Sequence, residues 1–152
     1  DRRQRQMCIR DRAYKCEIDH LLSRSILTLS GGEKQRVHFC RCLVQVLEEH
    51  DSDTPKYLLL DEPTSSQDIA NELRVLKLLK ETAIQREIGV FLIVHDLNLA
   101  AHFGDIFYIM KNGRLVAHGE RDAVMTENIL SSVYETPVKT ELTSSGVRIH
   151  TF

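Results

Sequence analysis

Two short segments of the chain are apolar at every position, and each is followed by polar or acidic residues. Residues 57–60 read Tyr-Leu-Leu-Leu and stop at Asp61, and residues 90–94 read Val-Phe-Leu-Ile-Val and stop at His95. A strand that is covered by helices on both faces shows such a continuous apolar run instead of alternation. The pattern therefore predicts two strands that are buried on both faces, in the centre of a parallel sheet.

Apolar residues at helical spacing predict two longer helices around these strands. The first spans residues 33–49, and its apolar face consists of Val37, Cys40, Val44 and Leu47. The second begins near residue 69, and its apolar face consists of Ile69, Leu73, Leu76, Leu79 and Ala83. We expect it to end near Gly89, because glycine is common just after the last turn of a helix.

The C-terminal third of the chain contains shorter elements. Asn112-Gly113 between two apolar runs is the strongest short signal of a β-hairpin, because both positions of such a turn need positive φ. In chain order we expect a helix at 97–103, strands at 106–111 and 114–118, a helix at about 126–134 and a polar tail. The two buried strands and the helix between them form a βαβ unit, so the fold class is α/β, a parallel sheet with flanking helices and a late β-hairpin. Ligands of such sheets bind beyond the carboxyl ends of the strands.

The composition is that of a globular chain, with 42% hydrophobic and 28% charged residues among 152. It excludes disorder of the whole chain. The longest apolar run is far shorter than the ~18 residues of a membrane-spanning helix, and no leader peptide is recognisable, so we expect neither a membrane span nor secretion. The four cysteines have no disulfide or metal spacing, which fits a reducing cytosol. The net charge of −2 does not point to nucleic acid as a partner.

The N-terminal residues differ from the rest in charge. Residues 1–16 hold five arginines and one lysine against two aspartates, a net charge of +4, whereas the remainder carries −6. One interpretation is a basic arm for nucleic acid or lipid. The run at 2–12 looks more like translated sequencing-adapter sequence, so we predict that residues 1–13 are a non-native leader and leave them out of the fold prediction.

Residues 29–35, Leu-Ser-Gly-Gly-Glu-Lys-Gln, stand at the start of the first long helix. Ser30 and Glu33 have the spacing of a capping box, which explains those two residues as a helix start. It does not explain Gly31 and Gly32, because each glycine costs roughly 0.8–1 kcal/mol relative to alanine in a helical turn. Glycine lets backbone N–H groups approach a ligand closely, and a helix N-terminus attracts anions. We therefore interpret this segment as a phosphate-binding helix start.

Asp61 and Glu62 leave the first apolar strand, and His95 leaves the second at the same edge of the sheet. Adjacent residues of a strand point to opposite sides, so we expect the two carboxylates to have different roles. One can hold Mg²⁺ through its waters, and the other can accept the proton of an attacking water. The histidine can donate a hydrogen bond to a phosphate oxygen. A structural alternative exists for each, because acids often end strands and a lone histidine is usually structural.

Together these motifs resemble the ATP-binding-cassette (ABC) ATPases, over essentially residues 25–135. The segments that carry the resemblance are the signature motif at 29–35, the Walker B strand at 57–62, the D-loop at 65–68 and the switch histidine His95. The D-loop of the family usually has leucine where Gln67 stands. The resemblance implies the ABC type of P-loop NTPase fold.

The resemblance also implies roles for individual residues. The residues that would contact ATP held by a second subunit are Ser30, Gly31, Gly32 and Gln35. Asp68 would link the two ATP sites, although it also has a simpler role as the N-cap of the helix that follows it. Asp61 would bind Mg²⁺ through water, Glu62 would be the catalytic base, and His95 would act at the phosphate. The implied activity is hydrolysis of ATP by an in-line water.

One motif of the family is missing from the sequence. A P-loop reads G-x-x-x-x-G-K-[ST], and none of the seven glycines is followed by lysine. We therefore expect the C-terminal part of an ABC nucleotide-binding domain: a leader at 1–13, a partial ATPase domain at 14–135 and a C-terminal tail at 136–152. Alone, the chain is expected to lack ATPase activity and to expose apolar strand surface.

Further segments indicate a branch of the family. Residues 95–101, His-Asp-Leu-Asn-Leu-Ala-Ala, and 116–119, Val-Ala-His-Gly, resemble importers of haem, iron-siderophores and cobalamin. The polar connection at 48–56 and the segment 134–138, Tyr-Glu-Thr-Pro-Val, are most similar to haemin-import ATPases. This implies a homodimer that drives a membrane permease from the cytoplasmic face of the plasma membrane. The alternatives are a siderophore or cobalamin importer, and a non-transport or regulatory cassette without activity.

Rival classes of cassette protein fit the sequence less well. A translation-associated cassette would read Asn-His-Leu-Asp where residues 65–68 read Ser-Ser-Gln-Asp. A chromosome-associated or repair ATPase would place long heptads or zinc cysteines around the signature, whereas Asp61 follows Ser30 by only 31 positions, without heptads. Intact Glu62 and His95 argue against a degenerate regulatory cassette.

Overall fold

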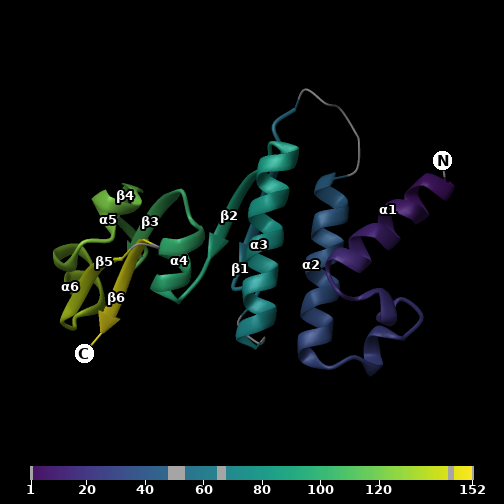
Figure 1. The fold of residues 1–152 in the computed structure, drawn as a ribbon, viewed down its shortest axis with the longest axis horizontal. Coiled ribbons are helices and arrows are strands. Elements are labelled where there is room, and N and C mark those ends of the chain that lie inside the picture. The colour runs from purple at the N-terminus through teal and green to yellow at the C-terminus, as the bar shows by residue number, and fades with distance from the viewer. Residues whose placement is uncertain (1, 48–53, 65–67, 144–145, 152) are drawn as a thin grey trace. The chain divides into compact units, whose positions relative to one another are not determined.

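The computed structural model describes residues 2–47, 54–64, 68–143 and 146–151. The chain forms two compact units, Asp1–Ile93 and Val94–Phe152. The first unit contains, in chain order, α1 (Arg2–Lys15), the 3-10 turns η1 (Asp19–Leu21) and η2 (Ile26–Thr28), α2 (Gly31–Leu47), β1 (Tyr57–Asp61), α3 (Ile69–Arg86) and β2 (Gly89–Ile93) (Figure 1). The predicted strand–helix–strand order is thus confirmed.

The first unit contains a two-stranded parallel sheet. β1 pairs with β2 in a register that sets Leu59 opposite Phe91 and Asp61 opposite Ile93. Helix α2 contacts β1 and helix α3 contacts β2, so the two helices cover one face of the sheet. The parallel pairing follows from the crossover through α3, because a connection of this length returns the second strand in the same direction.

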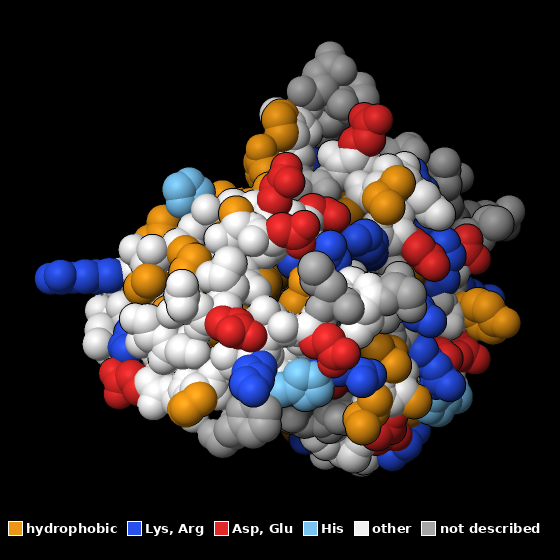
Figure 2. Space-filling model, turned by 60° about the vertical axis from the view of Figure 1, so that its left-hand side comes forward, with side chains coloured by type: hydrophobic (Ala, Val, Ile, Leu, Met, Phe, Trp, Pro, Cys, Tyr) orange, Lys and Arg blue, Asp and Glu red, His pale blue; other side chains and the backbone are white. Residues whose placement is uncertain are grey.

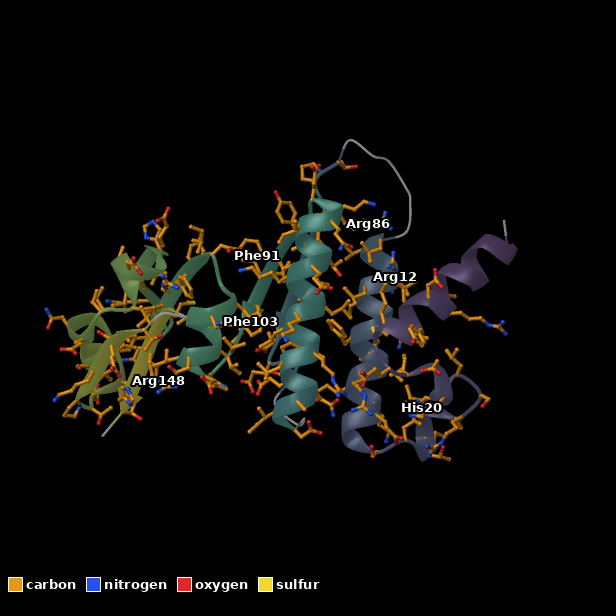
Figure 3. The ribbon with its side chains drawn as sticks, in the orientation of Figure 1. Arg12, His20, Arg86, Phe91, Phe103 and Arg148 are labelled. Carbon is orange, nitrogen blue, oxygen red and sulfur yellow. The ribbon has the colours of Figure 1, made fainter. Side chains whose placement is uncertain are left out.

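The strands are buried on one face only, so the prediction of burial on both faces is wrong. Leu58 is 4% exposed on the covered face. The other face is formed by alternate residues that are 52–73% exposed, namely Tyr57, Leu59, Phe91 and Ile93. We call this set the open face; Figure 3 shows Phe91 on the side of the sheet away from α2. Nothing among the described residues covers these side chains, which is why apolar strands remain half exposed.

The helices follow the predicted pattern with two corrections. In α2 the buried residues are Phe39, Cys40 and Leu43, so only Cys40 of the predicted apolar face is fully buried. Helix α3 ends at Arg86, and its C-cap is Glu87, in the left-handed conformation (φ 52°), and not Gly89. Gly89 instead begins β2, where a Cβ atom would lie 2.5 Å from Cδ1 of the Tyr57 ring. Its lack of a side chain serves this cross-strand contact.

Helix α1 includes the segment that was left out of the fold prediction. It contacts α2, and Ala13 and Cys16 are buried. The thiols of Cys16 and Cys40 are hydrogen bonded to each other, and donation by Cys16 lowers the pKa of Cys40 while it raises the pKa of Cys16. The structure thus adds a helix at this position, and whether residues 1–13 are native stays a prediction.

The second unit contains, in chain order, α4 (Leu97–Phe103), β3 (Ile106–Lys111), β4 (Arg114–Glu120), α5 (Arg121–Val124), α6 (Glu127–Tyr134), β5 (Val138–Thr143) and β6 (Gly146–Thr151). The predicted β3–β4 hairpin is confirmed, with Asn112 and Gly113 at φ 50° and 72°. The hydrophobic core of the second unit consists of Ala101, Phe107, Val124, Met125, Leu130, Val138 and Ile149. Every element of this unit except β4 supplies a residue to that core.

The segment predicted to be a polar tail forms the antiparallel hairpin β5–β6. Two hydrogen bonds between Asn98 on α4 and Ile149 hold the outer edge of β6. Asn98 Nδ2 donates to the Ile149 carbonyl at 3.1 Å, and the Ile149 N–H donates to Asn98 Oδ1 at 2.7 Å. On β5, the N–H groups of Val138 and Thr140 donate to side chains of α6. These tertiary bonds order a segment whose composition is that of a loop.

Candidate functional site

The start of α2 is a complete capping box. The N–H of Ser30 donates to Glu33 Oε2 at 2.7 Å, and the N–H of Glu33 donates to Ser30 Oγ at 3.3 Å. The first helical bond runs from the Lys34 N–H to the Ser30 carbonyl. The predicted S-x-x-E cap is confirmed, and it engages the N–H groups on either side of the two glycines but not those of Gly31 and Gly32.

Arg24, in the irregular segment before α2, contacts Glu33 of this cap. The sequence pattern did not indicate this contact. Its Nη1 lies 3.3 Å from Glu33 Oε1, and its Nη2 donates to the Thr28 carbonyl at 3.0 Å. The hydrogen bonds from Ser30, first its backbone N–H and then its hydroxyl, lower the pKa of Glu33, with a further contribution from Arg24. The helix start is therefore held in one geometry with Glu33 ionised.

Gly31 gives open access to the helix start. A Cβ atom built on Gly31 would have no described heavy atom within 4 Å. Alanine at this position would fit the chain itself and would improve helix propensity by roughly 0.8–1 kcal/mol. The glycine thus has no packing reason in this unit, and the accessible backbone at a helix N-terminus suits an anionic oxygen.

Glu62 lies just beyond the end of β1, with its backbone in the left-handed region at φ 45°. The expectation that Asp61 and Glu62 alternate across a strand is wrong for Glu62, because β1 ends at Asp61 and the left-handed turn redirects the chain. A non-glycine residue in this region costs about 1–3 kcal/mol and persists only where neighbours hold it. Such residues cluster at functional sites.

Two hydrogen bonds hold the Glu62 backbone. Its N–H donates to the Ile93 carbonyl at 3.1 Å, which extends the β1–β2 ladder by one residue. Its carbonyl accepts a hydrogen bond from Gln35 Nε2 on α2 at 3.2 Å. The structure therefore brings the signature helix and the predicted catalytic base together within one unit. The contact of Gln35 with ATP on a second subunit stays a prediction.

The chain after Glu62 is fixed to α3. Thr64 is buried and its hydroxyl donates to Glu72 Oε1 at 2.7 Å. Asp68 is the N-cap of α3, as expected from its simpler role: Oδ1 accepts from the Asn71 N–H at 2.9 Å. The predicted D-loop residues 65–67 lie outside the described residues, and the link of Asp68 to a second site stays a prediction.

His95 belongs to the second unit and is exposed. It stands directly before Asp96, which caps α4 by accepting the N–H groups of Asn98 and Leu99 at 2.7 and 3.0 Å. Within the described ranges no cluster of three or more His, Cys, Asp or Glu side chains is arranged for a metal ion. Asp61, exposed at the end of β1, fits a Mg²⁺ ion whose other ligands are water and phosphate oxygens.

Curated proteins of known family match most of the chain. The Hemin import ATP-binding protein HmuV of Escherichia coli O157:H7 is 42% identical over 119 residues, 78% of this chain and 46% of that protein. HmuV of Burkholderia cenocepacia (strain HI2424) is 42% identical over 130 residues, 84% of this chain and 47% of that protein. The chain thus spans about half the length of the curated relatives it matches.

Solved structures match the fold. An ABC transporter structure described as metal-chelate type and inward-facing aligns with a TM-score of 0.75 and 22% identity, covering 96% of this chain and 55% of that chain. The cbiO1 protein of Clostridium perfringens, part of the cbiONQ ABC transporter complex, aligns with a TM-score of 0.63 and 28% identity over 84% of this chain and 47% of that chain. No protein-family model matches the chain. With the capped signature helix and the backbone-fixed Glu62 in place, these likenesses show that the chain is similar to ABC ATPases over most of its length and has the fold of their cassettes.

Proposed function

We propose that the complete protein is the ATP-hydrolysing subunit of an ABC importer, with Glu62 as the general base. The observation that carries this proposal is the Glu62 backbone, held in a left-handed turn at the carboxyl end of β1 by Ile93 and Gln35. Ligands of open α/β sheets bind at this edge. The Glu62 backbone is strained, and two hydrogen bonds hold it. This suits a general base whose carboxylate must face the attacking water in one orientation.

Two further residues of the predicted motifs would act at the phosphate. Asp61 would hold Mg²⁺ through water, and His95 would donate a hydrogen bond to a phosphate oxygen. Bound Mg²⁺ supplies positive charge where negative charge develops during phosphoryl transfer. Glu62 would take the proton of the attacking water as its oxygen approaches phosphorus.

A second copy of the subunit would supply the ATP that the signature helix meets. Ser30, Gly31 and Gly32 would contact that nucleotide, and Asp68 would connect the two sites. Support comes from the open space beside Gly31 and from the rigid cap around it. An alanine at Gly31 would stand in the way of the partner's nucleotide without disturbing its own helix.

We further propose that the cargo is haem and that the subunit works with an integral membrane permease at the cytoplasmic side of the membrane. The matched relatives are named as hemin import ATP-binding proteins, which supports this assignment. No helix in the described part of the chain is long and apolar enough to cross a bilayer.

The test joins this chain to the N-terminal half of the Escherichia coli O157:H7 relative to give a complete subunit. We expect phosphate release from Mg²⁺-ATP on the order of 1 s⁻¹ or faster, within the usual enzyme range. The chain alone is expected to give none, because it has no Gly-Lys-Ser or Gly-Lys-Thr sequence. Glu62→Gln should keep ATP binding and lose turnover, because an amide cannot accept the proton of the water.

The matched control is Glu87→Gln, which removes a carboxylate from another left-handed position at the far end of α3. It should leave turnover near that of the unsubstituted protein. Near-normal turnover of Glu62→Gln would reject Glu62 as the base. Haem-stimulated ATPase activity with the permease, against siderophore and cobalamin as competitors, tests the cargo.

A further inference from the structure

We infer that Gln35 is a positioning residue for the catalytic base: its side-chain amide holds the backbone of Glu62 in the same subunit, so that the signature helix fixes the orientation of the base. This rests on the proposed function. It assigns to Gln35 a role within its own subunit, beside or instead of a contact with ATP on a second one.

The geometry defines the direction of this hydrogen bond. The Glu62 carbonyl can only accept, so the amide nitrogen of Gln35 must face it, and the 3.2 Å distance is that of a hydrogen bond. Residues 35 and 62 are 27 positions apart and lie on different elements. The bond therefore spans from the first turns of α2 to the turn after β1.

The contact leaves the other end of the amide unsatisfied. Gln35 Oε1 is buried and has no hydrogen-bond partner among the described residues. A residue retained for stability alone would turn this oxygen toward a donor or to water, because a buried polar atom without a partner is unfavourable. The Nε2 bond to the Glu62 carbonyl forms although it leaves Oε1 buried without a partner among the described residues. This points to a role of Gln35 in orienting Glu62.

The Glu62 backbone needs such a partner. Its φ of 45° is outside the usual range for residues with side chains, and its N–H donates to the Ile93 carbonyl. Loss of the Gln35 bond would remove a hydrogen bond from this carbonyl and favour rotation of the peptide toward the common β region. The carboxylate of Glu62 would move with that rotation.

The experiment uses the complete subunit described above and three variants. Gln35→Met removes the donor at similar side-chain length, and Gln35→Glu keeps the shape but donates only when its carboxyl is protonated. Gln45→Met, on the exposed side of the same helix, is the matched control. The measurements are kcat and KM for ATP over a range of pH, and hydrogen exchange of the Glu62 amide.

We expect Gln35→Met to lower kcat about ten- to a hundredfold, the effect of a misplaced reacting group, with KM nearly unchanged. Exchange of the Glu62 amide should become faster, while Gln45→Met changes neither. Gln35→Glu should be equally slow near pH 8 and should recover as pH falls, since protonation restores a donor. A purely structural role predicts no such recovery.

Three results separate the possibilities. Unchanged kcat and unchanged exchange at Glu62 in Gln35→Met would overturn the inference. A raised KM with normal kcat would also overturn it and would favour contact with ATP on the second subunit. If the unsubstituted complete subunit hydrolyses no ATP, the proposed function fails, and exchange at Glu62 in folded Gln35→Met still decides whether Gln35 holds that backbone.

Discussion

The parallel β1–β2 sheet and the antiparallel β5–β6 hairpin each have two strands, but they bury their side chains differently. In β1–β2 the apolar Leu59 and Phe91 are 73% and 52% exposed. In the more polar hairpin, Val138 and Ile149 are 3% and 6% exposed and belong to the core of the second unit. The burial of a strand therefore depends on the layers around it more than on its own hydrophobicity.

The β5–β6 hairpin also has side chains bonded along its edges. Asn98 binds the outer edge of β6, and Ser131 and Glu127 bind the N–H groups along β5. These side chains occupy backbone groups that would otherwise pair with another chain. The β1–β2 sheet has helices on one face and the open face on the other. Figure 2 shows hydrophobic side chains (orange) scattered over one face of the molecule. A strand face with several adjacent exposed apolar residues, such as the open face, is typical of a site that packs against further protein.

Replacing a buried leucine should lower the free energy of unfolding far more than replacing an exposed one. Leu130→Ala removes a side chain that is 0% exposed in the core of the second unit. It should lower the free energy of unfolding by about 2–5 kcal/mol, because it loses burial and leaves a cavity. Leu59→Ala, on the open face, is the matched control and should change it by less than about 0.5 kcal/mol. Urea titration followed by NMR signals of the second unit measures Leu130→Ala, and signals of the first unit measure Leu59→Ala. Equal losses would contradict the comparison.

The second expected effect concerns association through the open face. Leu59→Lys should raise the concentration at which the isolated chain self-associates by about ten- to a hundredfold, since burial of one leucine contributes roughly 1.5–3 kcal/mol to an interface. Analytical ultracentrifugation measures this directly. Lysine in place of Ile84, an exposed apolar residue on α3, is the control. A chain that is monomeric and melts cooperatively without any substitution would contradict the prediction.

A third substitution removes the two hydrogen bonds by which Asn98 holds the β5–β6 hairpin. Asn98→Ala removes two hydrogen bonds to Ile149 and should cost about 1–2 kcal/mol. The amide of Ile149 should exchange faster with solvent than in Asn128→Ala, an exposed asparagine on α6. If both variants exchange alike, the hairpin is held by its core residues rather than by its edge.

The smallest expected effect is the pH dependence of the α2 cap. The bonds from Ser30 hold the pKa of Glu33 below its ordinary value. The stabilisation is thus complete above that ordinary pKa and is lost as pH falls through the lowered pKa of the folded state. Helicity at the start of α2 should decrease in acid, and Glu33→Gln should remove this dependence while keeping a capping box. An unchanged acid response in Glu33→Gln would assign it to other carboxylates.

Features that depend on residues close together in the chain follow from the amino-acid sequence alone. The Ser30–Glu33 cap, the Asn112-Gly113 turn, the N-cap at Asp68 and the βαβ order follow from spacing and local geometry, and the structure has each of them. Local rules succeed there because both partners of each interaction lie within about one turn of the backbone. The signature and Walker B motifs indicated the resemblance to ABC ATPases for the same reason.

Tertiary packing determines which faces of the strands are buried and which backbone groups hold the site. The left-handed turn at Glu62, its hydrogen bond from Gln35 and the clamp of Asn98 on Ile149 join residues 27 to 51 positions apart. No periodicity encodes such pairs, because they form only once helices and strands have packed. The half-exposed strands and the ordered hairpin show the same limit: hydrophobic pattern assigns an element, and the neighbouring layers decide its burial.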